Sequence, residues 1–260
     1  MNILDNKYYD EDSIFKPENL LREAKRQKAL PDCKVPSICI LDPDGDILDY
    51  LLRTGKAKLN QCWACYHTRL YTFTLGEIEL GIAACAVGSS FAVLIAEQLF
   101  VSGCEVLISI TSSGIINKVS DKVEYILIEE ALRDEGTSYH YLPPDEASAI
   151  NSELLALLKE TLLNEALNTI IGKSWTTDAP YRETLPAIEN VKAVNIQVVE
   201  MEAAALYAFA KAKNKKVICF AHITNSMAQN DIDFEKGTEN GSIASLQLIY
   251  LTAKNLGWIK

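Results

Sequence analysis

Two glutamates and a methionine, Glu200-Met201-Glu202, stand between an apolar strand-like pair and an alanine-rich run at residues 203–210. An ionised carboxylate is costly to bury unless it is paired or binds a ligand, so this junction predicts a binding site at the edge of a cavity. The alternative is that both acids decorate the first turn of a helix, where the helix dipole favours negative charge. The residue types alone leave both interpretations open.

Small polar residues follow three other strand-like runs. They are the segment 111–114 (Thr-Ser-Ser-Gly), Thr177 and Asn225. An open α/β sheet binds its ligand beyond the carboxyl ends of its strands. We therefore expect these three strand ends to share one rim with the Glu200–Glu202 stretch, the alternative being an ordinary polar turn after each strand.

A turn with three aspartates, Asp42, Asp44 and Asp46, lies between an apolar run at residues 35–41 and a helical pattern at 47–52. Backbone N–H groups converge at such a turn and often bind an anion, but three carboxylates repel one. A solvated turn is the simplest interpretation, and a cation site is the alternative.

The seven cysteines are an odd number, and several lie inside apolar runs, which is typical of thiols in a reducing compartment. Cys62 and Cys65 have the C-x-x-C spacing of a redox pair or of half a zinc site. A redox pair would open a helix, whereas an alternating strand pattern follows here, and no second C-x-x-C completes a metal site. We expect structural or incidental thiols and no metal site.

Strand and helix patterns alternate along most of the chain. They predict an α/β fold, a single domain with a mixed, mostly parallel central sheet flanked by helices. We expect an N-terminal segment at residues 1–34, with a helix at 17–29, and the main domain at 35–260. The segment 111–114 is expected to be a turn, and a later helix to open at Asp145.

Charge and hydropathy exclude several classes of protein. The formal charge of −10 over 260 residues disfavours non-specific binding to nucleic acid or to an anionic membrane. No apolar run is long enough to span a bilayer, and residues 1–15 lack the basic-then-apolar order of a signal peptide. We expect a cytoplasmic protein.

The stretch 199–207, VEMEAAALY, resembles the ribose-binding signature of the nucleoside phosphorylase family, which includes uridine phosphorylase, hexameric purine nucleoside phosphorylase and the related nucleosidases. The resemblance covers about residues 35–257. Supporting matches are Gly88 with the helix after it, the segment 111–114, the segment 177–181 and the strand that leads to Asn225. The resemblance implies that family's fold and a nucleoside substrate.

By this resemblance, Glu202 accepts hydrogen bonds from the ribose hydroxyls and Met201 packs against the sugar. Breaking an N-glycosidic bond develops positive charge on the ribose ring, which an ionised carboxylate stabilises. We expect the helix N-terminus to keep Glu202 ionised. Glu200 either supports the base or is a structural acid.

The base half of the site departs from the family pattern. Asn225 stands where the purine phosphorylases carry an aspartate that protonates the leaving base, and an amide can hydrogen-bond a base but cannot act as a general acid. The glutamine and arginine with which uridine phosphorylases bind uracil are not evident after Tyr181. We name Asn225 and Glu202 as catalytic candidates and leave the base open between purine and pyrimidine. The base-binding candidates are Ser113, Gly114, Thr177, Tyr181 and Glu200.

The phosphate-binding half of the site departs further from the family pattern. Family phosphorylases hold phosphate with a glycine and an arginine in the first strand-to-helix turn and an arginine before the T-S-G-like turn, and this chain has Asp44, approximately Leu48, and Ser109 there. Each lost guanidinium removes contacts worth roughly 1.5–3 kcal/mol. If none is replaced, water is the nucleophile, with Asp42, Asp44 or Asp46 as a possible base. The phosphate-binding candidates are Gly88, Ser112, Arg69 and Arg182, with His67 able to assist.

The resemblance implies a pentosyltransferase of nucleoside salvage that produces free base and ribose 1-phosphate. The alternatives are a nucleosidase that hydrolyses the same bond and a nucleoside-binding protein without turnover. Phosphate is expected as a co-substrate, with no organic cofactor. Family members are dimers or trimers of dimers, so a homo-oligomer is expected.

Overall fold

Seven α-helices surround a ten-stranded sheet in the computed structural model, which describes residues 2, 4–164, 168–226 and 236–257. The helices are α1 (Pro17–Lys28), α2 (Asp46–Arg53), α3 (Ser89–Val101), α4 (Ser152–Asn164), α5 (Leu185–Ala193), α6 (Ala203–Ala212) and α7 (Ser242–Leu256). Three short 3₁₀ turns, η1 (Ser138–His140), η2 (Pro180–Arg182) and η3 (Thr238–Gly241), lie between them.

The strands alternate with these helices, as their sequence patterns predict. They are β1 (Ile38–Asp42), β2 (Lys58–Leu59), β3 (Leu70–Leu75), β4 (Ile78–Ala84), β5 (Val106–Ile115), β6 (Tyr125–Asp134), β7 (Ser148–Ala149), β8 (Thr169–Thr177), β9 (Val198–Glu200) and β10 (Lys216–Ser226). The central strand β1 is apolar on both faces, which is typical of a parallel strand covered on both sides.

The sheet is mixed and closes on itself at one end. Its order is β10-β6-β8-β9-β5-β1-β4-β3-β2, and β10 also pairs with β5, so β5, β10, β6, β8 and β9 form a ring. Within the described residues, β1–β4, β1–β5, β5–β10, β6–β8 and β8–β9 are parallel, whereas the other pairings are antiparallel. The predicted α/β fold with a mixed sheet is confirmed.

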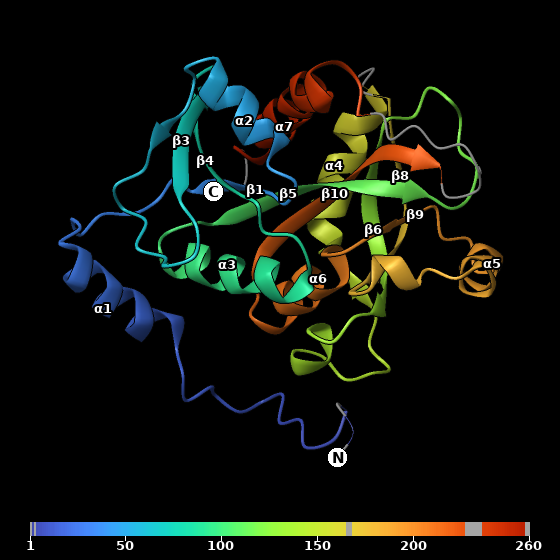
Figure 1. Ribbon diagram of the computed structural model, residues 1–260, viewed down its shortest axis with the longest axis horizontal. Coiled ribbons are helices and arrows are strands. Elements are labelled where there is room, and N and C mark those ends of the chain that lie inside the picture. The colour runs from blue at the N-terminus through green and yellow to red at the C-terminus, as the bar shows by residue number, and fades with distance from the viewer. Residues whose placement is uncertain (1, 3, 165–167, 227–235, 258–260) are drawn as a thin grey trace.

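Helices cover both faces of the sheet (Figure 1). Helices α2, α4 and α7 lie together on one side, and α3 and α6 lie on the other, with α1 packed outside α3. Helix α6 begins with eight consecutive buried residues, from Ala203 to Ala210. The small side chains of this helix let it lie close to both the sheet and α3, and this fixes the position of the Glu200–Glu202 stretch that precedes it.

Two element boundaries differ from the sequence prediction. The segment 111–114 is not a turn but part of β5, because β10 and β9 pair with it on either side. The helix expected from Asp145 begins at Ser152, since the preceding residues form β7, which pairs with β6. Helix α5 was not predicted.

The expectation of free structural thiols was wrong for two of the seven cysteines. Cys33 and Cys62 form a disulfide, with their Cα atoms 5.2 Å apart, within the range that such a bridge requires. Cys65, the other half of the C-x-x-C motif, is free and buried. The bridge ties the connection after α1 to the loop that precedes β3.

Over the part of the chain that the structure describes, no helix is both long and apolar enough to cross a membrane. Among the same residues, no three or more histidine, cysteine, aspartate or glutamate side chains are arranged to hold a metal ion.

Candidate functional site

Glu200 ends β9 and holds the start of α6. One of its carboxylate oxygens accepts hydrogen bonds from the hydroxyls of Ser174, at 2.9 Å, and Thr176. The other accepts from the backbone N–H groups of Glu202 and Ala203, both at 2.7 Å. With four donors around it, this buried carboxylate is satisfied by the protein itself.

Glu202 is the residue immediately before α6, and its side chain is 1% exposed. Its Oε1 accepts a hydrogen bond of 2.6 Å from the backbone N–H of Gly88, at the start of α3. Its Oε2 is buried without a hydrogen-bond partner in the described structure. Next to it, the Met201 carbonyl accepts a hydrogen bond of 2.8 Å from the Ser89 hydroxyl. The N-termini of α3 and α6 are thus joined at this point.

The two glutamates compete for one negative charge. Burial, and then the charge of Glu200, raise the pKa of Glu202 to about 8, although the Gly88 N–H and the nearby Thr111 hydroxyl oppose this. Burial also raises the pKa of Glu200, against its four donors. Because those donors all favour the ionised form of Glu200, we assign the charge to Glu200 and the proton to Glu202 at neutral pH. The expectation that the helix N-terminus keeps Glu202 ionised was wrong in the absence of a ligand.

The turn between β1 and α2 repeats this arrangement with aspartates. Asp42 is buried and accepts hydrogen bonds from the N–H groups of Gly45, at 3.1 Å, and Leu48, at 2.9 Å, at the start of α2. Burial raises the pKa of Asp42 to about 7. Asp44 reaches across to β5, where its Oδ2 accepts a hydrogen bond of 2.9 Å from the Ser112 N–H.

Lys236 partly neutralises this acidic turn. Its ammonium pairs with Asp46 and lies 3.8 Å from the Asp44 carboxylate. His222 of β10 lies near the same groups, but burial and the charge of Lys236 lower its pKa to about 4. His222 is therefore neutral at physiological pH and adds no positive charge here.

The structure brings several predicted site residues together at the ends of β5, β8, β9 and β10. Gly114 is paired with Asn225 on one side and with Val199 on the other, and Thr176 is paired with Glu200. The buried Ser113 hydroxyl donates a hydrogen bond of 2.9 Å to the His222 carbonyl, so it is used within the ring of strands. Thr177 is buried, and its hydroxyl accepts from the Ala179 N–H.

Three other candidates lie apart from this cluster. Tyr181, in η2, is 99% exposed, and Arg182 beside it is also exposed. Arg69 precedes β3 and lies at the same sheet edge as the end of β4, because Leu70 pairs with Ala83 in the antiparallel pair β3–β4. Three strand steps separate β3 from β5, a distance of ~14 Å. Within one subunit, Arg69 therefore starts three strands away from Ser112, and Arg182 lies in solvent beside Tyr181.

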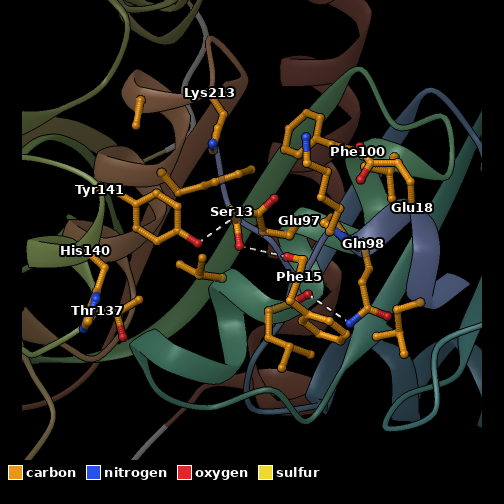
Figure 2. Close-up of a pocket in the computed structure, with 18 of the residues that line it drawn as sticks. Ser13, Phe15, Glu18, Glu97, Gln98, Phe100, Thr137, His140, Tyr141 and Lys213 are labelled. Carbon is orange, nitrogen blue, oxygen red and sulfur yellow. Dashed lines mark hydrogen bonds between the residues drawn. The ribbon is translucent and has the colours of Figure 1, made fainter. Parts of the chain in front are cut away.

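A large cavity lies elsewhere. It has a volume of about 900 Å³ and is lined by the N-terminal residues, α3, η1 and the end of α6. In Figure 2, Ser13 and Phe15 of the N-terminal residues face Glu97 and Tyr141, whose hydroxyl donates a hydrogen bond of 2.9 Å to the Glu97 carboxylate. Of the predicted site residues, His67 lines this cavity, whereas the Glu200–Glu202 stretch and the strand-end residues do not.

Sequence reasoning missed the residues that hold the acids in place. Ser174 and Thr176 alternate along β8 and point the same way, a period-two pattern that could have been found. Ser89 follows the Gly88 turn and could have been recognised as a residue at the start of a helix. No local sequence pattern predicts the role of Lys236, because only the fold brings it to Asp46.

A single α/β domain with a mixed sheet flanked by helices is consistent with the nucleoside phosphorylase fold. The chain belongs to the phosphorylase superfamily, whose sequence model matches residues 37–253. It is also similar to a uridine phosphorylase of Thermococcus kodakarensis, with 20% identity over 234 residues, which are 81% of this chain and 84% of that protein. The family resemblance noted from the sequence is thereby confirmed.

Proposed function

We propose that this protein cleaves the N-glycosidic bond of a nucleoside. The observation that carries the proposal is the Glu202 carboxyl group, which is fixed at one oxygen by the Gly88 N–H and unpartnered at the other. A ribose hydroxyl that reaches Oε2 supplies the hydrogen bond that this buried atom lacks. Because Glu202 is 1% exposed, its neighbours must move aside when the sugar binds.

Charge explains how such a contact promotes cleavage. As the bond to the base breaks, positive charge develops on the ribose ring, and the buried negative charge shared by Glu200 and Glu202 stabilises it. The four donors around Glu200 hold that charge in place before the substrate arrives. Asn225, at the end of β10, is the candidate for hydrogen bonding to the departing base.

Phosphorolysis, which produces free base and ribose 1-phosphate, is the reaction that membership of the superfamily supports. It requires phosphate to bind near the Ser112 N–H and the Gly88 turn. Both N–H groups are already bonded to carboxylates of the chain itself, from Asp44 and Glu202. A phosphate would therefore have to displace Asp44 and to recruit a cation such as Arg69 or Arg182.

Hydrolysis is a second candidate, and the position of Asp44 favours it. A carboxylate already occupies the N–H group of Ser112, and Asp42 and Asp46 lie in the same turn, so a dianion is repelled. Water is not repelled. In this reaction Asp44 accepts a proton from the attacking water, and the water oxygen forms the new bond to the ribose carbon as the base leaves.

The test is to incubate the purified protein with a panel of purine and pyrimidine nucleosides, with and without phosphate, and to measure free base. Release that depends on phosphate supports phosphorolysis, and release without phosphate supports hydrolysis. A Glu202→Gln variant is the matched control, since it keeps the size of the side chain. Binding of nucleosides without any release of base would contradict the proposed enzymatic activity and would support a nucleoside-binding protein without turnover.

Two further properties are proposed on the likeness to the family and on composition. We expect a homo-oligomer, either a dimer or a trimer of dimers, in which Arg69 or Arg182 of one subunit could approach the rim of another. Light scattering on the purified protein measures the number of subunits, and a monomer would contradict the prediction. The five free cysteines support a cytoplasmic location, whereas the Cys33–Cys62 disulfide counts against it.

A further inference from the structure

The N-terminal segment is docked on the main domain by few apolar contacts. Leu21 and Ala24 are the buried residues of α1, and they pack with Ala64 in a small cluster separate from the main core. Leu30 and Val101 lie beside this cluster. Because so little apolar surface is buried, the position of α1 depends strongly on its other attachments.

The hydrogen bonds that α1 itself makes to the main domain lead to the loop that contains the C-x-x-C motif, whereas residues before α1 reach η1 through Lys7 and Tyr9. The Lys28 ammonium donates hydrogen bonds to the carbonyls of Ala64, at 2.8 Å, and Cys65, at 2.7 Å, and lies 4.6 Å from the centre of the Tyr66 ring. The Tyr66 hydroxyl donates a hydrogen bond of 2.8 Å to the Gln27 amide oxygen. The Cys33–Cys62 disulfide crosslinks the same two pieces of chain.

A third sulfur lies in this loop. Cys65 follows Cys62 at the spacing of redox-active pairs, is free and is 4% exposed. Its Sγ accepts a hydrogen bond of 3.4 Å from the His67 N–H. Cys33, at the other end of the disulfide, is partly exposed. Cys62 is thus bonded to a cysteine from the N-terminal segment while a second possible partner lies three residues away in its own loop.

We propose that the Cys33–Cys62 disulfide is a thiol-exchange site at which Cys65 releases the N-terminal segment. The Cys65 thiolate attacks the Sγ of Cys62, the Cys62–Cys65 bond forms, and the Cys33–Cys62 bond breaks with Cys33 leaving as a thiolate. The proton lost by Cys65 is regained at Cys33, and no oxidant or reductant is consumed. Exchange therefore converts a link between two segments into a link within one loop.

Release of α1 changes the surroundings of α3. Residues before α1, including Tyr9 and Phe15, form one wall of the cavity of about 900 Å³, and α3 forms another (Figure 2). The loop that contains the C-x-x-C motif also contacts α3 directly, since the His67 and Phe91 rings pack edge to face with their centres 6.5 Å apart. Undocking of α1 therefore exposes a groove along α3, whose first residue, Ser89, binds the Met201 carbonyl.

The exchange is tested by incubating the oxidised protein at mildly alkaline pH with a catalytic amount of glutathione, then trapping free thiols with acid and an alkylating agent. Peptide mapping without reduction identifies the disulfides, and limited trypsin digestion measures cleavage at Arg26 and Lys28. We expect the Cys62–Cys65 peptide to appear together with cleavage in α1. Cys85→Ser, at an exposed free thiol, is the matched control and should behave like the wild type.

Two variants separate exchange from simple reduction. Cys33→Ser should form the Cys62–Cys65 bond in air. Trypsin should cleave α1 of this variant about tenfold faster than α1 of the wild type. Cys65→Ser should keep the Cys33–Cys62 bond and resist trypsin under the same catalytic glutathione. Absence of a Cys62–Cys65 peptide in both the wild type and Cys33→Ser overturns the proposal, as does equally fast release of α1 in Cys65→Ser. Circular dichroism spectra confirm that each variant is folded.

Discussion

The two acidic strand-to-helix turns of this protein, β1–α2 and β9–α6, are built alike but end differently. In each, an inner acid binds the N–H groups of the following helix, Asp42 for α2 and Glu200 for α6. In each, an outer acid two residues later reaches a backbone N–H of another element, Asp44 at Ser112 and Glu202 at Gly88. The inner acids serve the fold, and the outer acids face the rim.

The two turns differ in whether a buried polar atom is left without a hydrogen-bond partner. The β1–α2 turn is neutralised in part by Lys236, and Asp44 already fills the N–H group where an anion would bind. The β9–α6 turn leaves Glu202 Oε2 buried and unpartnered. A buried oxygen without a hydrogen-bond partner favours the binding of a ligand that can donate to it. A carboxylate that already accepts from the N–H group disfavours the binding of an anion there. Under the proposed function, the Glu202 side of the rim can accept a hydrogen bond from a sugar hydroxyl, whereas the Asp44 side already holds a carboxylate of the chain itself.

The sharpest test of this comparison is Glu202→Gln. The amide keeps the size of the side chain but cannot ionise. Position 202 can then no longer share the buried negative charge with Glu200 as positive charge develops on ribose, so cleavage of nucleosides should fall ~10²–10³-fold. Folding should be preserved, because a neutral group suits the buried position. Steady-state rates of base release measure the effect, and an unchanged rate would refute the role of Glu202.

Glu200→Ala tests the inner acid. It leaves two hydroxyls and two backbone N–H groups without their acceptor, so the free energy of unfolding should fall by about 3 kcal/mol or more. Asp42→Ala removes two hydrogen bonds and should cost less, about 1–2 kcal/mol. Urea unfolding of both variants gives the comparison. A smaller loss for Glu200→Ala than for Asp42→Ala would contradict the assignment of Glu200 as the main support of its helix.

Asp44→Asn tests the outer acid of the other turn. Removing its charge weakens repulsion of phosphate and removes a possible base for water. We therefore expect the ratio of phosphate-dependent to phosphate-independent base release to rise about tenfold. Rates measured over a series of phosphate concentrations supply this ratio. If Asp44 is only a structural residue of the turn, both rates will fall together.

The pH dependence of stability should reveal the buried protons. The pKa of Glu202 rises from its ordinary value of 4.5 to about 8, and that of Asp42 from 3.8 to about 7. The folded state therefore binds more protons than the unfolded state above pH ~5, and the free energy of unfolding should decrease as pH rises towards 8, by about 1 kcal/mol per pH unit for each group. Glu202→Gln and Asp42→Asn should each flatten the slope. A parallel pH profile in both variants would contradict these pKa values.

Most of the fold could be predicted from the sequence because buried parallel strands and their helices leave strong apolar patterns. The runs that became β1, β4 and β10 are examples. The end of β5 was missed, because hydroxyls and glycine at residues 111–114 suit a turn locally, and only pairing with β9 and β10 makes them a strand. The Cys33–Cys62 bridge could not be predicted, since the spacing of cysteines does not determine their pairing.

Glu200, Met201 and Glu202 were named because acids at an apolar junction are unusual and because the stretch resembles a family signature. The structural alternative for Glu200 is the one that its contacts support. The sequence left it open, because those contacts depend on Ser174 and Thr176, which come from another strand. Tyr181 was proposed from its position after Thr177, but the chain turns in η2 and leaves the ring in solvent.

The ring of strands also has a consequence for how the protein is made. Of the described strands, β10 is the last to leave the ribosome, yet it lies between β5 and β6. It pairs with β5 along its length and with β6 at Phe220–His222. Until β10 is synthesised, β5 and β6 each have an unpaired edge. Unpaired strand edges can associate with other chains. The rim and the ring are completed by the same late strand, so a chain that has not closed its ring has no site.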